Sequence, residues 1–124
     1  MNHQRPVNLD LGSLKYPPMA IASILHRISG LVLFILLPVM LYFLNLSLNS
    51  ADSFLYLQTL LAFSFCKLIL WAFGTALGYH VLAGIRHMLM DIGFGEEVLT
   101  ASRSANLVIV LAIIVSIILG VRIW

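Results

Sequence analysis

Three apolar stretches, each long enough to cross a lipid bilayer as a helix, dominate this sequence. They cover Ile28–Leu44, Leu68–Ile85 and Asn106–Ile123. A helix of about 20 residues spans a hydrocarbon core roughly 30 Å thick. Within lipid, a helix satisfies all its backbone polar groups internally, whereas an irregular segment does not. The sequence therefore predicts an all-α membrane protein with three transmembrane helices.

The overall composition excludes a soluble domain. The chain has 124 residues, of which 61% are hydrophobic and only 10% are charged, and its mean hydropathy is +1.04. A soluble domain of this size needs a polar shell that these residues cannot provide. The net charge of +2 gives no electrostatic footprint for nucleic acid. The single cysteine, Cys66, excludes an internal disulfide and an all-cysteine metal cluster.

We interpret residues 1–124 as one membrane domain. Residues 1–20 are polar and contain three prolines, so they are expected to lie outside the membrane. The expected spans are about 21–48, 60–90 and 104–123. Polar loops are expected between them, at Asn45–Ser53 and at Asp91–Ser104. Pro38 is expected to kink the first helix, which neighbouring helices can tolerate.

The distribution of basic residues predicts the orientation of the helices. Five basic residues lie on the N-terminal side and two on the other, namely Arg5, Lys15, Arg27, Arg86 and Arg103 against Lys67 and Arg122. Because basic loops stay inside, the N-terminus is predicted to be cytoplasmic. The first apolar stretch contains Pro38 and lacks a cleavage site, so it does not resemble a signal peptide. These features favour a multi-pass protein of the bacterial inner membrane; a processed mitochondrial protein would share them.

The most informative single residue is His80, which lies inside the second apolar stretch. Ionisable residues at membrane depth are costly and usually functional. His80, Gly84 and His87 share one helical face, and Arg86 lies about 9 Å further along the helix axis. A neutral imidazole can ligate haem iron, and cationic side chains can pair with haem propionates. This arrangement predicts a haem b site in which His80 is an axial ligand.

A six-coordinate haem needs a second ligand that this face does not supply. His87 lies two turns from His80 on the same side, so it cannot reach the opposite face of the ring. The second ligand is therefore expected from another chain, which predicts an oligomeric helix bundle. A purely structural alternative remains, in which His80 only hydrogen-bonds a neighbouring helix and Gly84 only allows close packing. His87 and Arg86 could then be ordinary interfacial residues.

A second polar group lies at the start of the first helix, in the segment SILHRISG. Ser23 and Arg27 are four residues apart and share a helical face, with His26 beside them. At the mouth of an apolar pocket, a hydroxyl and a guanidinium can donate hydrogen bonds to the carbonyl oxygens of a lipid-soluble quinone. In the alternative interpretation, Arg27 is an interfacial anchor and Ser23 a helix N-cap.

Three short segments together resemble one known family, the cytochrome b556 membrane subunits of succinate dehydrogenase. They are RPVNLDL at Arg5–Leu11, SILHRISG at Ser23–Gly30 and YHVLAGIRHMLMD at Tyr79–Asp91. All three occur in the family's order and at its spacing. The resemblance implies a membrane anchor of complex II, a hetero-oligomeric helix bundle that binds haem b.

The resemblance also implies a role for each candidate residue. His80 would be one axial ligand of haem b, and a second hydrophobic anchor subunit would supply the other. Ser23 and Arg27 would line the site where ubiquinone is reduced, while His26, Arg27 and His87 would lie near the haem propionates.

The partners implied are that anchor subunit, an iron-sulfur subunit and a flavoprotein subunit. Flavin and iron-sulfur chemistry would belong to the soluble subunits, so this chain would carry no catalytic residue. Electrons from succinate oxidation in the tricarboxylic acid cycle would pass to the quinone.

Three alternatives stay open beside this interpretation. A fumarate reductase anchor would share the architecture and run the reverse reaction. A purely structural anchor would bind neither haem nor quinone. A small transporter or proton path could use His80 and Lys67, but the apolar stretches contain no Asp or Glu to complete such a path.

Overall fold

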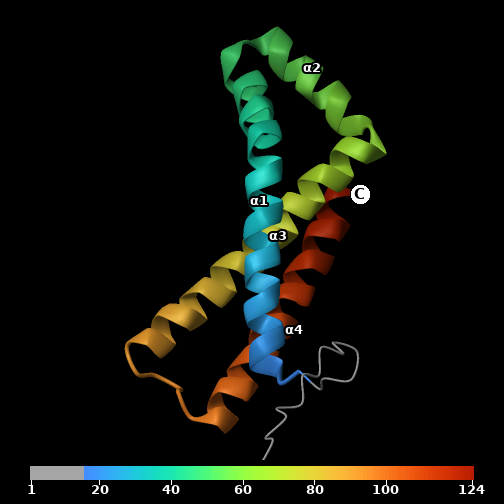
Figure 1. Cartoon of the computed structure of the whole chain (residues 1–124). Coiled ribbons are helices and arrows are strands. Elements are labelled where there is room, and N and C mark those ends of the chain that lie inside the picture. The colour runs from blue at the N-terminus through green and yellow to red at the C-terminus, as the bar shows by residue number, and fades with distance from the viewer. Residues whose placement is uncertain (1–15) are drawn as a thin grey trace, which may run out of the picture.

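The computed structural model describes residues 16–124, which form an all-helical chain (Figure 1). The helices are α1 (Pro18–Asn49), α2 (Ala51–Ala62), α3 (Ser64–Asp91) and α4 (Val98–Ile123). Three of them, α1, α3 and α4, are long and apolar enough to cross a membrane, which confirms the predicted fold class. The expectations about Arg5, Lys15 and the segment Arg5–Leu11 lie outside the described residues.

The first connection differs from the predicted polar loop at Asn45–Ser53. Helix α1 continues to Asn49, and α2 begins at Ala51, so only Ser50 interrupts the helices. A capping box explains the short turn: the Ser53 amide donates to Ser50 Oγ at 3.1 Å, and the Ser50 amide donates to Ser53 Oγ at 3.0 Å. These two bonds satisfy amides that the start of a helix leaves unpaired.

The segment before the second span is a separate helix rather than the start of that span. The backbone at Phe63 is extended, with ψ of 132°, and divides α2 from α3. The second span therefore begins at Ser64 rather than near residue 60. The connection after it is also shorter than predicted, because α4 begins at Val98 and not near residue 104. Gly93 and Gly95 have φ of 89° and 75°, values that glycine adopts without strain.

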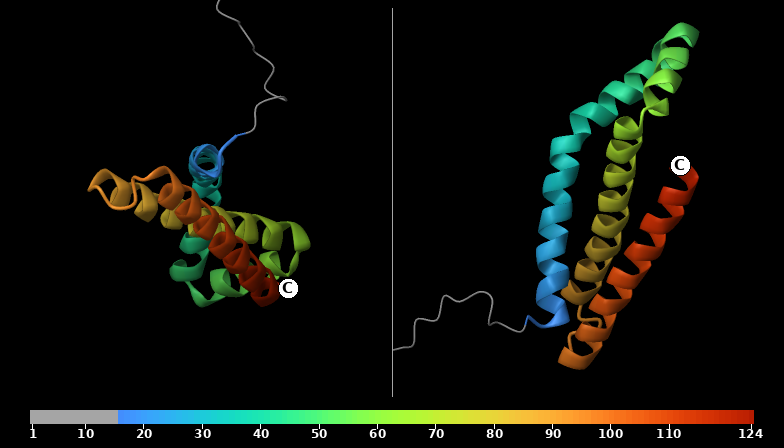
Figure 2. Two further views of the ribbon diagram at one scale, coloured as in Figure 1. Left: turned by 90° about the horizontal axis from the view of Figure 1, so that it is seen from below. Right: turned by 90° about the vertical axis from the view of Figure 1, so that its right-hand side faces the viewer.

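The three long helices lie side by side, with α3 in contact with both α1 and α4 (Figures 1 and 2). Helix α1 bends toward α2 in its C-terminal part (Figure 2), where Pro38 removes a backbone hydrogen bond. The start of α1 and the α3–α4 connection lie at one end, called here the α3–α4 end (Figure 1). Helix α2 and Trp124 lie at the other end.

Small residues allow the close approach of the helices. The buried alanines are Ala22, Ala76, Ala83, Ala101, Ala105 and Ala112. At Gly78 an added Cβ would lie 3.0 Å from Cγ1 of Val115, so α4 packs directly against the backbone of α3. Small residues serve this purpose in membranes, where helix association depends on van der Waals packing. Most large apolar side chains face outward, as expected for helices surrounded by lipid.

Replacing Gly78 by leucine should separate α3 from α4. The new side chain would collide with Val115, and overpacking of this kind costs about 1–3 kcal/mol. The thermal unfolding midpoint of the detergent-purified protein should fall. Val81→Leu adds volume at a half-exposed position of the same helix and is the matched control. Equal midpoints for the two variants would contradict the packing described here.

Candidate functional site

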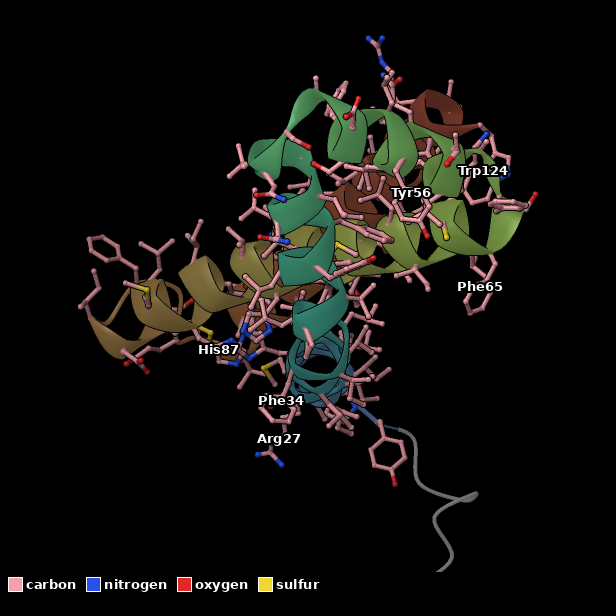
Figure 3. The ribbon with its side chains drawn as sticks, turned by 90° about the horizontal axis from the view of Figure 1, so that it is seen from above. Arg27, Phe34, Tyr56, Phe65, His87 and Trp124 are labelled. Carbon is pink, nitrogen blue, oxygen red and sulfur yellow. The ribbon has the colours of Figure 1, made fainter. Side chains whose placement is uncertain are left out.

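Three imidazole rings stack between α1 and α3, a group called here the histidine stack (His26, His80 and His87). The ring of His26 lies 4.1 Å from that of His80, with an interplanar angle of 17°. The same ring lies 5.0 Å from that of His87, at 28°. Figure 3 shows His87 on the α3 segment beside α1. Sequence reasoning expected only His80 at depth, whereas the structure brings the ring of His26 directly against it.

Glycines provide the space for these rings. A Cβ added to Gly84 would lie 3.7 Å from Nε2 of His26, and one added to Gly30 would lie 3.2 Å from Cε1 of His80. The space above Gly84, where the sequence predicted a haem, thus accommodates a flat ring. In this structure that ring is the imidazole of His26. Gly30 was missed by sequence reasoning, although it ends the segment that contains His26.

Two oxygens of α1 hold the ring of His80 in place. Its Nδ1 lies 3.0 Å from Ser29 Oγ and 3.2 Å from the His26 carbonyl oxygen. Ser29 Oγ donates its one proton to that same carbonyl at 2.8 Å, so the hydroxyl can only accept from His80. The arrangement therefore requires a proton on Nδ1 of His80. Its Nε2 is then the basic nitrogen, free to bind a metal or accept a hydrogen bond.

Sequence reasoning also missed Ser29, the residue whose hydroxyl contacts His80. It is only 6% exposed and lies on the face of α1 that meets α3. Its spacing of three residues from His26 is the signal that could have identified it, because residues three apart share a helical face.

The other two members of the histidine stack differ in their hydrogen bonding. Nδ1 of His87 donates to the carbonyl oxygen of Ala83 at 2.7 Å, one turn earlier in α3. Nε2 of His26 is buried and has no hydrogen-bond partner within residues 16–124. Buried polar atoms in folded proteins nearly always have a partner. Among the described residues, the stack therefore leaves this buried ring nitrogen without a partner.

A buried tyrosine joins α1 to α3 at the level of the stack. Tyr79 is 8% exposed, and its hydroxyl donates to the carbonyl oxygen of Ala22 at 2.7 Å. This bond fixes the separation of the two helices one residue before His80. It therefore contributes to the geometry in which Ser29 meets the imidazole.

Ser23 and Arg27 lie on α1 at the α3–α4 end, the end that also holds the histidine stack. Ser23 is partly buried and Arg27 is exposed. The Arg27 side chain projects from α1 away from the other helices (Figure 3). Arg27 thus extends away from the described helices, whereas His26 on the same helix turns inward.

Arg86, whose cationic side chain the sequence placed near the predicted haem site, faces α4 instead of the histidine stack. It is only 6% exposed, and its guanidinium donates to Ser104 Oγ and to the Ala101 carbonyl, both at 3.0 Å. Adjacent helical residues point about 100° apart because the helix has about 3.6 residues per turn. Arg86 consequently faces α4, while His87 faces α1.

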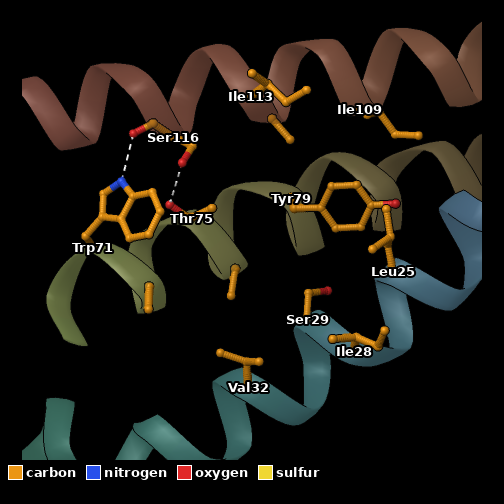
Figure 4. A pocket seen from close by; sticks show the side chains of 13 residues that line it. Leu25, Ile28, Ser29, Val32, Trp71, Thr75, Tyr79, Ile109, Ile113 and Ser116 are labelled. Carbon is orange, nitrogen blue, oxygen red and sulfur yellow. Dashed lines mark hydrogen bonds between the residues drawn. The ribbon is translucent and has the colours of Figure 1, made fainter. Parts of the chain in front are cut away.

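An apolar pocket of about 450 Å³ lies where α1, α3 and α4 meet (Figure 4). Its few polar groups bond within the chain: Trp71 Nε1 donates to the Ser116 carbonyl at 2.9 Å, and Thr75 Oγ1 donates to Ser116 Oγ at 3.1 Å.

This pocket adjoins the candidate site at Ser29. Ser29 lines the pocket as well as contacting His80. Ser23 and Arg27 are not among its lining residues.

Comparison with known proteins identifies relatives along the whole chain. A succinate dehydrogenase cytochrome b556 subunit of Coxiella burnetii is 49% identical over 125 residues, covering 100% of both chains. One from Rickettsia typhi is 33% identical over 98% of this chain and 92% of the relative. A cytochrome b560 subunit of Reclinomonas americana is 34% identical over 79% of this chain and 72% of its own.

Residues 1–119 match the family described as succinate dehydrogenase/fumarate reductase transmembrane subunit. This match and the curated relatives confirm the resemblance found in the sequence. The chain belongs to the succinate dehydrogenase/fumarate reductase transmembrane subunit family.

Proposed function

We propose that this chain is a membrane-anchor subunit of succinate:ubiquinone oxidoreductase that supplies one axial ligand to haem b and part of the ubiquinone-reduction site. Family membership supports the general assignment, because curated relatives that align with the chain end to end are named succinate dehydrogenase cytochrome b556 subunits. The residue roles rest on the chemistry of the site.

The observation that carries the proposal is the hydrogen bonding of His80. A histidine that ligates a metal usually donates its other ring N–H to a carbonyl or another acceptor, which fixes the tautomer and the ring orientation. The Nδ1 of His80 has such acceptors in Ser29 Oγ and the His26 carbonyl. Its Nε2 is the free basic nitrogen, suited to haem iron. Haem bound there would act as a reversible one-electron carrier.

The remaining histidines suit the periphery of a haem better than its axis. Stacked rings hold their nitrogens side by side, whereas two axial ligands must point at each other across the iron. His26 stacks on His80 and therefore does not provide the second ligand. We assign that ligand to a second hydrophobic anchor subunit. The unpartnered Nε2 of His26 and the nearby His87 would bond to the propionates.

Ser23 and Arg27 are the proposed quinone residues. Arg27 extends outward from α1, so it can reach a pocket completed by a neighbouring subunit (Figure 3). A guanidinium and a hydroxyl both donate hydrogen bonds, which quinone carbonyl oxygens accept. The charge that develops on a quinone oxygen during reduction would strengthen the bond to Arg27. The apolar pocket of about 450 Å³ lacks both residues, so it does not serve as this site.

The proposed complex contains an iron-sulfur subunit and a flavoprotein subunit beside the two anchors. Succinate oxidation would take place in the soluble subunits, and the electrons would pass to quinone at the membrane surface. The basic residues Arg27, Arg86 and Arg103 lie at the α3–α4 end, which favours the cytoplasmic side for that end. A bacterial inner membrane is the proposed location.

A fumarate reductase anchor is the second candidate function. The matched family includes subunits of both enzymes, and both directions need the same arrangement of membrane helices. The relatives described above are all subunits of succinate dehydrogenase, which favours succinate oxidation.

Replacing Ser29 by alanine tests the proposed haem site. The change removes one acceptor from Nδ1 of His80 and leaves the weaker His26 carbonyl at 3.2 Å. Loss of such a supporting bond lowers metal affinity about 10- to 100-fold, and we expect the lower end of that range. Haem should dissociate more readily, and its midpoint potential should rise because the imidazole becomes a poorer donor.

Ser47→Ala is the matched control for this experiment. Ser47 Oγ donates to a carbonyl three residues earlier, as Ser29 does, but contacts no histidine. Haem retention and a redox titration of the purified complex provide the measurements. Identical values for the wild type and Ser29→Ala would show that Ser29 does not support a haem ligand.

Replacing Arg27 by alanine should impair quinone reduction but leave haem bound. Loss of a charge-assisted hydrogen bond should lower kcat/KM for quinone about 10- to 100-fold. Arg103→Ala removes an exposed arginine at the same end of the bundle and serves as the control. Assays with succinate and a soluble quinone, together with haem spectra, separate the two roles. Complete loss of haem in an otherwise assembled Arg27→Ala complex would contradict this separation.

A further inference from the structure

Arg86 is a buried cation between α3 and α4. Its side chain is 6% exposed, and both acceptors that it contacts within residues 16–124 are neutral. A guanidinium has five N–H donors, and these contacts use two of them. Burying a positive charge is costly unless an anion accompanies it. The described chain therefore leaves this cation in need of a negative group from outside.

A pocket of about 350 Å³ adjoins Arg86 on this face. Arg86 and Ser104 are its polar lining residues, and Met90, Phe94 and Gly95 line it next to the α3–α4 connection. Leu82 and Val108 continue it as an apolar slot toward the middle of the membrane. One occupant would therefore need an anionic group and a hydrocarbon chain in the same molecule.

We propose that this pocket, called here the Arg86 pocket, binds an anionic phospholipid. Its phosphate would accept hydrogen bonds from the guanidinium, and an acyl chain would lie along Leu82 and Val108. Arginine suits phosphate because its planar donors match two oxygens at once. Basic pockets between transmembrane helices at the cytoplasmic side bind anionic head groups in this manner.

The chemistry of the walls favours a lipid over a carboxylate from another subunit. A carboxylate would neutralise Arg86 but would leave the apolar slot beside it unfilled. A phospholipid satisfies the charge and fills the slot together. The site faces α4, whereas the histidine stack lies on the α1 side of α3. The proposal is therefore independent of haem and quinone binding.

Native mass spectrometry of the complex purified in mild detergent tests this site directly. Phosphatidylglycerol is added to the wild type, Arg86→Gln and Arg103→Gln, and phosphatidylcholine is added in parallel. We expect a high-affinity phosphatidylglycerol adduct in the wild type and in Arg103→Gln. Its affinity should fall about tenfold in Arg86→Gln, as expected when a charge-assisted hydrogen bond is lost. Phosphatidylcholine should bind weakly in all three.

A second variant keeps the test valid if Arg86→Gln fails to assemble. Leu107 lines the pocket and is 58% exposed, so Leu107→Trp can fill the slot while leaving Arg86 in place. The adduct should weaken in this variant as well. Equal phosphatidylglycerol binding in the wild type and in each assembled pocket variant would overturn the proposal. So would loss of a co-purifying subunit from Arg86→Gln with lipid binding intact, because Arg86 would then pair with a protein carboxylate.

Discussion

The hydrogen bond between Ser29 and His80 forms only because α1 approaches α3 closely. The candidate site depends on this hydrogen bond and on this close approach. Gly30 leaves no side chain where the imidazole lies, and the Tyr79 hydroxyl bonds to the backbone of α1 beside it. At this separation Ser29 Oγ and the His26 carbonyl both reach Nδ1 of His80. In the neutral imidazole, the proton then lies on Nδ1 and the lone pair of Nε2 is left for a ligand. A small change in helix spacing would remove this control, because hydrogen bonds weaken steeply with distance and angle.

Helix α3 presents different kinds of residue to α1 and to α4. The side toward α1 carries His80 and His87, with Gly84 between them in the sequence. The imidazole ring of His26 stacks against both histidines there. The side toward α4 carries Gly78, against which Val115 packs, and ends at the buried Arg86. This division follows from helical geometry, because Arg86 and His87 are neighbours in sequence yet point about 100° apart. The proposed haem and lipid sites can therefore lie on opposite sides of α3 without sharing a residue.

Much of the fold could be predicted from hydropathy, because lipid allows few solutions for a long apolar segment. The three spans were predicted, but two connections were not. The turn at Ser50 depends on a reciprocal pair of serine hydrogen bonds. The extended backbone at Phe63, which divides α2 from α3, has no signal in the residue types around it. Helical spacing placed His80 with Gly84 and His87. Helical spacing could not show which face of α1 would pack against these residues of α3. The inward positions of His26 and Ser29 were therefore missed.

The central claim is that His80 ligates a haem in this subunit. A dithionite-reduced minus oxidised spectrum of the detergent-purified complex, wild type beside His80→Leu, tests it most directly. The account predicts a sharp b-type band in the wild type that is shifted or lost in the variant, while the subunits stay assembled. An unchanged band in His80→Leu would show that another residue ligates the iron. The absence of any band in intact, quinone-active wild-type complex would reduce His80 to a packing residue.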